Sequence, residues 1–95
     1  MLKYRKKPVT IEAVQWRGEN DKEIKDFVGE NLKIELVREP EMTSSGFIPK
    51  WVELTIKTLA GDMKISVGDY VIRGVKGEFY PCTADIFQAT YEQIK

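Results

Sequence analysis

The sequence predicts a single α+β domain over residues 1–95, built on a small, curved, mostly antiparallel β-sheet of about six strands that ends in a C-terminal meander. Short segments alternate apolar and polar side chains, as half-buried strands do. One stretch near 20–29 instead has helical spacing, and a helical turn is expected near 83–89. Glycine turns separate the last strands, and connections this short join antiparallel neighbours. A chain of ninety-five residues has room for one hydrophobic core.

The first expected strand covers residues 9–16. Pro8 cannot donate a backbone hydrogen bond, which suits the start of a strand, and Val9, Ile11 and Ala13 then alternate with their neighbours. Trp16 shares the face of Thr10, opposite that apolar set. It is interpreted either as a lid over the edge of the core or as an exposed aromatic surface.

The expected helix near 20–29 begins after Gly18. Asn20 followed by Glu23 predicts a capping box, and Gly29 is a typical C-terminal cap. The apolar stripe is made by Ile24, Phe27 and Val28. The charged residues on the other side are interpreted as a solvated face or, alternatively, as an acidic docking site.

The middle of the chain contains two further alternating segments, 32–38 and 50–58, separated by residues 39–49. Pro, Ser and Gly in this separating segment predict a loop. Its apolar residues Met42, Phe47 and Ile48 are expected to pack on the core, the alternative being that they cover a partner or ligand. Trp51 is expected to face outward.

The C-terminal meander is expected to use strands near 62–67, 70–73 and 78–81. Gly68, Gly74 and Gly77 each indicate a positive φ or a close backbone approach, because glycine otherwise weakens regular structure. Thr83 is a candidate N-cap for the following helical turn. Residues 90–94 are interpreted as a closing strand.

Both ends of the chain carry a resemblance. The first region contains Lys3-Tyr4-Arg5-Lys6-Lys7-Pro8-Val9, Glu12-Ala13 and Gly18-Glu19-Asn20. The second, where the resemblance is strongest, contains Gly68-Asp69-Tyr70, Gly74-Val75-Lys76-Gly77-Glu78-Phe79-Tyr80-Pro81-Cys82, Asp85-Ile86-Phe87 and Thr90-Tyr91-Glu92. In these two regions the chain is similar to a family of small, largely uncharacterised phage and prophage proteins. Residues 30–60 do not carry the resemblance, and Val67 and Thr83-Ala84 depart from it. It implies a phage accessory protein. By analogy with small β-rich phage proteins, such a protein would sequester a nucleotide signal of bacterial defence.

The glycine turns near 74–77 also suggest a ligand site from the residues themselves. Glycine lets backbone N–H groups approach a phosphate, while cations supply charge and aromatic rings stack on a base. The candidate ligand-binding residues are Arg5, Lys6, Trp16, Arg73, Lys76, Phe79 and Tyr80. Hairpin turns and cores use the same residue types, so packing is the alternative interpretation.

Composition narrows the chemistry. The chain has no histidine and one cysteine, so Cys/His metal sites, histidine bases and an internal disulfide are excluded. Cys82 is interpreted as a buried structural thiol, the alternative being a reactive one with a lowered pKa near a helix N-terminus. Glu78 and Asp85 are a weak candidate acid/base pair. We therefore expect no catalytic residue, no metal and no cofactor.

Charge and hydropathy bear on partners and location. Equal numbers of acidic and basic residues make duplex nucleic acid an unlikely partner, and no apolar run has the length of a membrane span. A cytoplasmic protein, in the host cell, is the expectation, and the small core favours a homo-oligomer. Three functions stay open: a non-enzymatic trap for a small anionic ligand, a module that docks on a host or virion protein, and a small hydrolase.

Overall fold

The computed structural model describes residues 1–5 and 7–94, and its elements confirm an α+β fold. In chain order they are β1 (Glu12–Gln15), α1 (Asp21–Val28), the 3-10 turn η1 (Gly29–Asn31), β2 (Leu32–Arg38), β3 (Glu41–Thr43), β4 (Gly46–Ile48), β5 (Trp51–Thr58), β6 (Gly61–Ile65), β7 (Tyr70–Arg73), β8 (Phe79–Cys82) and α2 (Ala84–Thr90). All strand pairs are antiparallel. Eight strands are present, where about six were expected.

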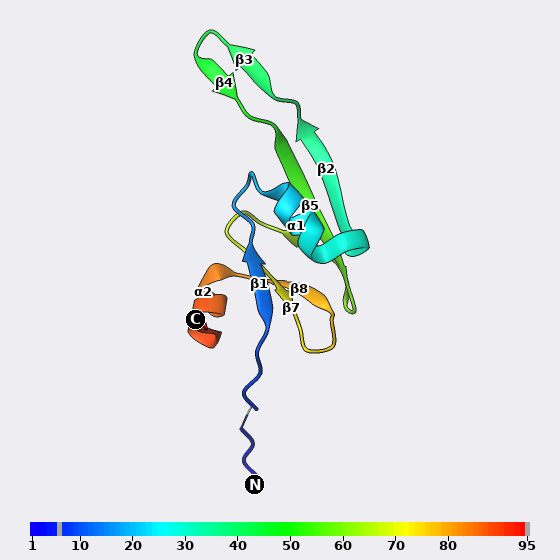
Figure 1. The fold of residues 1–95 in the computed structure, drawn as a ribbon, viewed down its shortest axis with the longest axis vertical. Coiled ribbons are helices and arrows are strands. Elements are labelled where there is room, and N and C mark those ends of the chain that lie inside the picture. Colours follow the sequence, from blue (N-terminus) through cyan, green and yellow to red (C-terminus); the bar gives the residue numbers. More distant parts are fainter. Residues whose placement is uncertain (6, 95) are drawn as a thin grey trace.

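The strands form three small sheets and not one continuous sheet (Figure 1). The first sheet has the order β1-β7-β8, the second has the order β2-β5-β6, and β3 pairs with β4 alone. β6 and β7 therefore do not pair, so the expected meander is divided between two sheets. The core between the sheets and α1 contains Trp16, Ile24, Val28, Leu32, Val52, Leu54, Ile56, Ile65 and Val71.

Both faces of the first sheet are covered, which explains the position of Trp16. The register pairs Val14 with Val71, and both face the core. Trp16 follows on the side of Val14 and is only 2% exposed. Its backbone is fixed by bonds to the Asp69 carbonyl (2.8 Å) and from the Gly68 N–H (2.7 Å). The expectation of an edge lid or exposed aromatic surface is therefore wrong.

The first strand is shorter than expected because its partner ends. β1 begins at Glu12, which pairs with the last residue of β7, Arg73. Residues 9–11 extend past this point without a partner strand. Beyond the sheet they run on into the exposed N-terminal segment (Figure 1).

Helix α1 has the expected apolar stripe but a different start. Ile24 and Val28 are buried against the core, and Gly29, at φ 78°, ends the helix. The prediction of a capping box is wrong, because the Asn20 side chain makes no hydrogen bond to a backbone N–H of the helix. Instead its amide donates to the Gln15 carbonyl (2.8 Å) and to Glu23 Oε1 (2.7 Å). Asn20 thus ties the helix to the end of β1.

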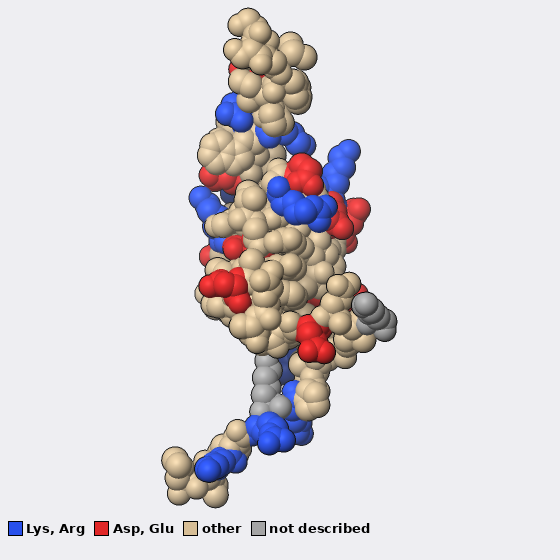
Figure 2. All heavy atoms as spheres, turned by 90° about the vertical axis from the view of Figure 1, so that its left-hand side faces the viewer, with Lys and Arg blue, Asp and Glu red and all other residues tan. Residues whose placement is uncertain are grey.

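Residues 39–50 form a projecting arm, and the prediction of a loop there is wrong. β3 and β4 pair as a hairpin, whose turn is held by Thr43 Oγ1 donating to the Gly46 carbonyl (2.8 Å). The arm projects at one end of the longest dimension of the molecule, which is 65 Å, and the N-terminal segment projects at the other end (Figure 1). Met42 and Phe47 are 75% and 61% exposed, so the expectation that they pack on the core is also wrong. Figure 2 shows mostly uncharged residues at the end of the arm.

An ion pair joins the base of the arm to α1. Lys50 Nζ lies 3.3 Å from Asp21 Oδ2, and Asp21 is buried. Asp21 is the first residue of α1, where a negative charge also interacts favourably with the helix dipole. The arm is therefore attached to the body through β2, β5 and this contact.

The closing strand expected over 90–94 is absent. α2 occupies residues Ala84–Thr90, and residues 91–94 continue without strand pairing. The Tyr91 N–H still donates to the Phe87 carbonyl (2.9 Å), in helical fashion. Because Phe87 and Tyr91 are four residues apart, both rings face the first sheet. Within the described residues, no helix has the length and hydropathy to cross a membrane.

Candidate functional site

The glycine turn after β7 has the tight geometry that the sequence indicated. Gly77 has a φ of 80°, which side chains other than glycine rarely adopt. The turn is closed by the Gly74 N–H donating to the Glu78 carbonyl (2.7 Å) and the Gly77 N–H donating to the Gly74 carbonyl (3.0 Å). A hollow of about 370 Å³, here called the turn hollow, lies beside it. It is lined by Thr10, Ile11, Glu12, Arg73, Gly74, Val75 and Gly77.

The carboxylate of Glu78 already occupies the anion position of this turn. Its Oε2 accepts from the Lys76 N–H at 2.9 Å. A Cβ at residue 74 would collide with Glu78 Oε1, so Gly74 is the residue over which this carboxylate folds. The backbone donor that was expected to meet an external phosphate therefore has an internal partner.

Arg73 is also engaged. Its Nη1 lies 3.7 Å from Glu12 Oε1, and its guanidinium carbon lies 6.0 Å from the centre of the Phe79 ring. Phe79 in turn packs edge-on against Phe27 of α1, with ring centres 5.4 Å apart. The positive charge at the turn hollow is thus paired with Glu12.

The seven residues predicted for a ligand site do not come together. Arg73 and Phe79 are register partners and share one face of the first sheet, beside the turn that contains Lys76. Tyr80 pairs with Ile72 and so faces the opposite side of the sheet. Trp16 is in the core, Arg5 is on the exposed N-terminal segment, and Lys6 lies outside the described residues.

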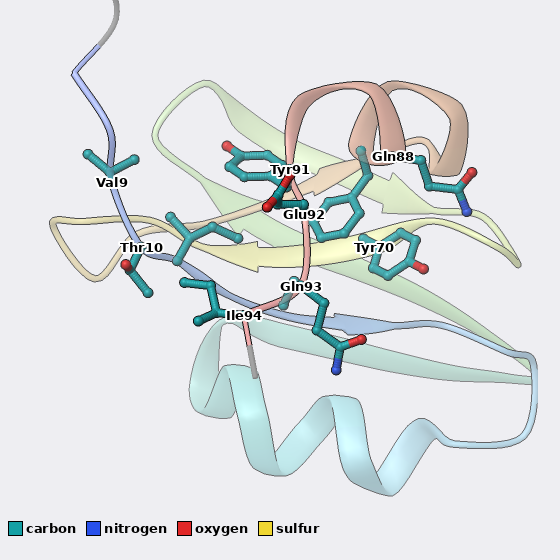
Figure 3. A pocket seen from close by; sticks show the side chains of 11 residues that line it. Val9, Thr10, Tyr70, Gln88, Tyr91, Glu92, Gln93 and Ile94 are labelled. Atoms are coloured by element: carbon teal, nitrogen blue, oxygen red, sulfur yellow. The ribbon is translucent and has the colours of Figure 1, made fainter.

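A larger pocket, here called the C-terminal pocket, lies on the other face of the first sheet. Its volume is about 630 Å³. Figure 3 shows Val9 and Thr10 on the N-terminal side, Tyr70 on the sheet, and Gln88, Tyr91 and Gln93 on the C-terminal side. The lining residues are Val9, Thr10, Ile11, Ala13, Tyr70, Phe87, Gln88, Tyr91, Glu92, Gln93 and Ile94. Glu92 is the one carboxylate among them.

An aromatic stack fixes the wall of this pocket. The Tyr70 and Phe87 rings are stacked, with centres 3.9 Å apart and planes 7° apart. The Phe87 and Tyr91 ring centres are 5.1 Å apart. Tyr91 is also hydrogen-bonded to Tyr80 of β8. These contacts hold α2 and the following residues on the sheet.

Sequence reasoning missed this pocket, although one signal for it was present. Phe87 and Tyr91 are four residues apart, the spacing of neighbours on a helix face. The interpretation of 90–94 as a strand assigned the two rings to different elements. No local pattern indicates that Val9 and Thr10 lie across from them, because that contact depends on the pairing of β1 with β7.

Tyr80 provides a test of this packing through its ionisation. Burial, then the hydrogen bond and charge interaction with Tyr91, raise the pKa of Tyr80 to about 12 from 10.0, with smaller contributions from Glu78 and Cys82. The fold therefore favours the neutral phenol. Its stabilising contribution is complete below the unfolded pKa and is lost as the pH rises from about 10 to about 12.

We expect an ultraviolet titration of phenolate to contain one late component, near pH 12, that is absent in the Tyr80→Phe variant. If the phenolate signal that the variant loses titrates near pH 10 in the parent chain, the packing of Tyr80 against Tyr91 is contradicted.

The surroundings of the other potentially reactive side chains, Cys82, Glu78 and Asp85, favour structural roles for them. Cys82 is half-buried, and burial first, then Asp69 and Asp85, raise the pKa of its thiol, so the alternative of a lowered pKa is wrong. The pKa of Asp85 is lowered by hydrogen bonds, the largest from Thr83. Glu78 is held by its own turn. The two carboxylates proposed as an acid/base pair are thus each bonded locally.

The comparisons with known proteins add no relative. No family model, no curated protein and no solved structure matches the chain. Over residues 1–5 and 7–94, no group of three or more Cys, Asp or Glu side chains is arranged to hold a metal ion. The geometry of the two hollows is therefore the basis for a functional proposal.

Proposed function

We propose that this protein is a non-enzymatic binding protein for a small, anionic, nucleotide-like ligand whose planar ring enters the C-terminal pocket. The observation that carries the proposal is the pocket of about 630 Å³ with an aromatic wall. Small-molecule sites have volumes of roughly 300–1,000 Å³. The amides of Gln88 and Gln93 line it as well, and amide groups can both donate to and accept from the edge of a base.

The basic N-terminal segment is the proposed partner of the anionic part of the ligand. Lys3, Arg5 and Lys7 are exposed and precede Val9, which lines the pocket. Figure 2 shows their positive charges gathered on this segment. The turn hollow is the weaker candidate, since Arg73 is paired with Glu12 and the Lys76 N–H is bonded to Glu78.

The specific form of the proposal is a phage accessory protein that sequesters a bacterial defence signal in the host cytoplasm. It rests on the resemblance of the two ends of the chain to small phage and prophage proteins. Binding without turnover is supported by the chemistry of the lining. Its ionisable groups are one carboxylate, Glu92, and two phenols, Tyr70 and Tyr91. Such a set binds and stacks, whereas hydrolysis needs an acid and a base positioned at the reacting bond.

Calorimetry with mono-, di- and cyclic nucleotides at two salt concentrations tests the proposal. We expect Gln88→Ala and Gln93→Ala each to weaken binding by about two- to ten-fold, the effect of one lost hydrogen bond. Both side chains are exposed, so the fold should be unchanged. The double variant Arg5→Ala/Lys7→Ala should weaken binding further and reduce its salt dependence. Mass spectrometry of the released ligand should recover it intact.

Arg73→Ala is the matched control, because Arg73 lines the turn hollow and not the C-terminal pocket. Unchanged affinity in this variant supports the C-terminal pocket. Loss of binding in Arg73→Ala, with no effect of Gln88→Ala, would assign the ligand to the turn hollow. Failure of every nucleotide to bind would contradict the proposal, and release of a hydrolysed product would favour an enzyme.

A second candidate function is docking on a host or virion protein, and the arm favours it. Met42 and Phe47 on the arm are 75% and 61% exposed, and Trp51 at its base is 50% exposed. Exposed apolar side chains grouped in this way are typical of interaction surfaces. This function would be sensitive to Met42→Ser/Phe47→Ser and indifferent to Gln88→Ala. The two variants therefore distinguish the candidates.

A further inference from the structure

Strand β2 is a free edge of the second sheet. The sheet order is β2-β5-β6, so among the described residues β2 has a paired strand only on the β5 side (Figure 1). Residues 32–36 pair regularly with β5, and the register shifts between Leu36 and Arg38. At the other end Lys25 Nζ reaches the Leu32 carbonyl (3.3 Å). The regular edge is therefore the segment 32–36.

Two side chains of opposite charge on this edge lack ion-pair partners within residues 1–5 and 7–94. Lys33 and Glu35 are both exposed. Glu35 lies directly opposite Glu53 of β5, a like-charge pair that is unfavourable across two strands. Glu53 has its own cation, Lys64, at 3.4 Å. Glu35 has none, and its free side is the outer edge of the sheet.

The other face of the same edge is apolar and uncovered. Ile34 and Leu36 pair with Leu54 and Val52, which are buried, yet Ile34 and Leu36 are 38% and 48% exposed. The core ends at β5 along this part of the sheet. An additional strand beside β2 would extend that core by one row of side chains.

We propose that the occupant of this edge is β2 of a second copy of the chain, paired antiparallel about a two-fold axis through Ile34. In this register Lys33 faces Glu35 of the partner subunit, and Glu35 faces Lys33 of the partner subunit. On the apolar face Ile34 meets its own copy, and Leu32 meets Leu36 of the partner subunit. The two second sheets become one six-stranded sheet.

Charge selects this register over its neighbours. Side chains that lie opposite each other on two neighbouring strands are on the same side of the sheet. The alternative registers of β2 with its copy therefore all keep the apolar side chains on one face and the charged side chains on the other. Centring the axis on residue 33 brings Lys33 against its own copy, and centring it on residue 35 brings Glu35 against its own copy. Only the register centred on Ile34 places Lys33 opposite Glu35 of the partner subunit. The two-fold axis repeats this pair, so the dimer contains it twice.

The test is the solution mass as a function of concentration, measured by sedimentation or light scattering. The wild-type chain of 11.0 kDa should reach twice that mass. Lys33→Glu and Glu35→Lys should each weaken dimerisation by about ten- to hundred-fold, because two attractive pairs become repulsive in every dimer. An equimolar mixture of the two variants should form a heterodimer, and Lys33→Glu/Glu35→Lys should recover the homodimer.

Lys22→Glu on α1 is the control for net charge, because Lys22 is exposed and does not belong to β2. It should dimerise like the parent chain. A wild-type chain that stays at 11.0 kDa at every concentration overturns the proposal. A dimer that tolerates both single reversals, or a mixture that fails to associate, also overturns it, since either result places the interface elsewhere.

Discussion

Replacing Trp16 with alanine is expected to lower the free energy of unfolding by about 3–5 kcal/mol, the usual cost of truncating a buried tryptophan. The indole is 2% exposed and belongs to the core that joins both sheets and α1. Its loss leaves a cavity that the two sheets cannot easily close, because each is fixed by strand pairing. Urea unfolding followed by circular dichroism measures the effect as a shift in midpoint.

The second tryptophan of the chain provides the control. Trp51 is 50% exposed at the base of the arm, so Trp51→Ala should cost less than about 1 kcal/mol. Equal losses in the two variants would mean that Trp16 does not occupy the core. The slope of the urea transition should stay the same in both variants, since the same surface is exposed on unfolding.

Phe87→Ala should have the next largest effect, on stability and on the proposed ligand together. The ring lies between Tyr70, at 3.9 Å, and Tyr91, at 5.1 Å, and attaches α2 to the first sheet. Since the side chain is half-buried, we expect a loss of about 2–4 kcal/mol. Because Phe87 also lines the C-terminal pocket, ligand binding should be abolished.

Ile86→Ala is the matched control for this prediction. Ile86 is the preceding residue of α2 and is 57% exposed, outside the pocket lining. Its truncation should change stability by less than about 1 kcal/mol and leave ligand affinity unchanged. Amide hydrogen exchange should show faster exchange of α2 in Phe87→Ala alone. Equal exchange in both variants would contradict the role given to the stack.

The predictable parts of this fold are those where one face of an element is buried and the other is exposed. β5 was predicted correctly because Val52, Leu54 and Ile56 are buried, while their neighbours face outward. For β1 the alternation of apolar and polar residues indicated the wrong core face. Both faces of this strand are covered, so alternation does not distinguish the side that faces the core. The arm was missed for another reason: β3 and β4 are three residues each, shorter than any periodic signal.

The candidate site shows the same limit at the level of chemistry. The residue types near 73–80 matched an anion site, and the glycine geometry was as expected at Gly77 and Gly74. Composition did not reveal that Glu78 would fill the turn or that Tyr80 would face the other side of the sheet. Both facts depend on strand register. The C-terminal pocket likewise depends on a contact between the two ends of the chain, which no local pattern encodes.

The pairing of β1 with β7 has a consequence for the order of events during synthesis. The second sheet uses only residues 32–65, so its strands are all present once that stretch has left the ribosome. β1 precedes the second sheet in the sequence, yet β7, its paired strand within the described residues, follows that sheet. Until β7 is made, β1 has no strand to pair with, and Trp16 lacks its backbone hydrogen bonds to Gly68 and Asp69. Among the described strands, β1 is therefore the one that waits longest for its paired strand, and its apolar side chains stay exposed to chaperones and proteases until β7 is made.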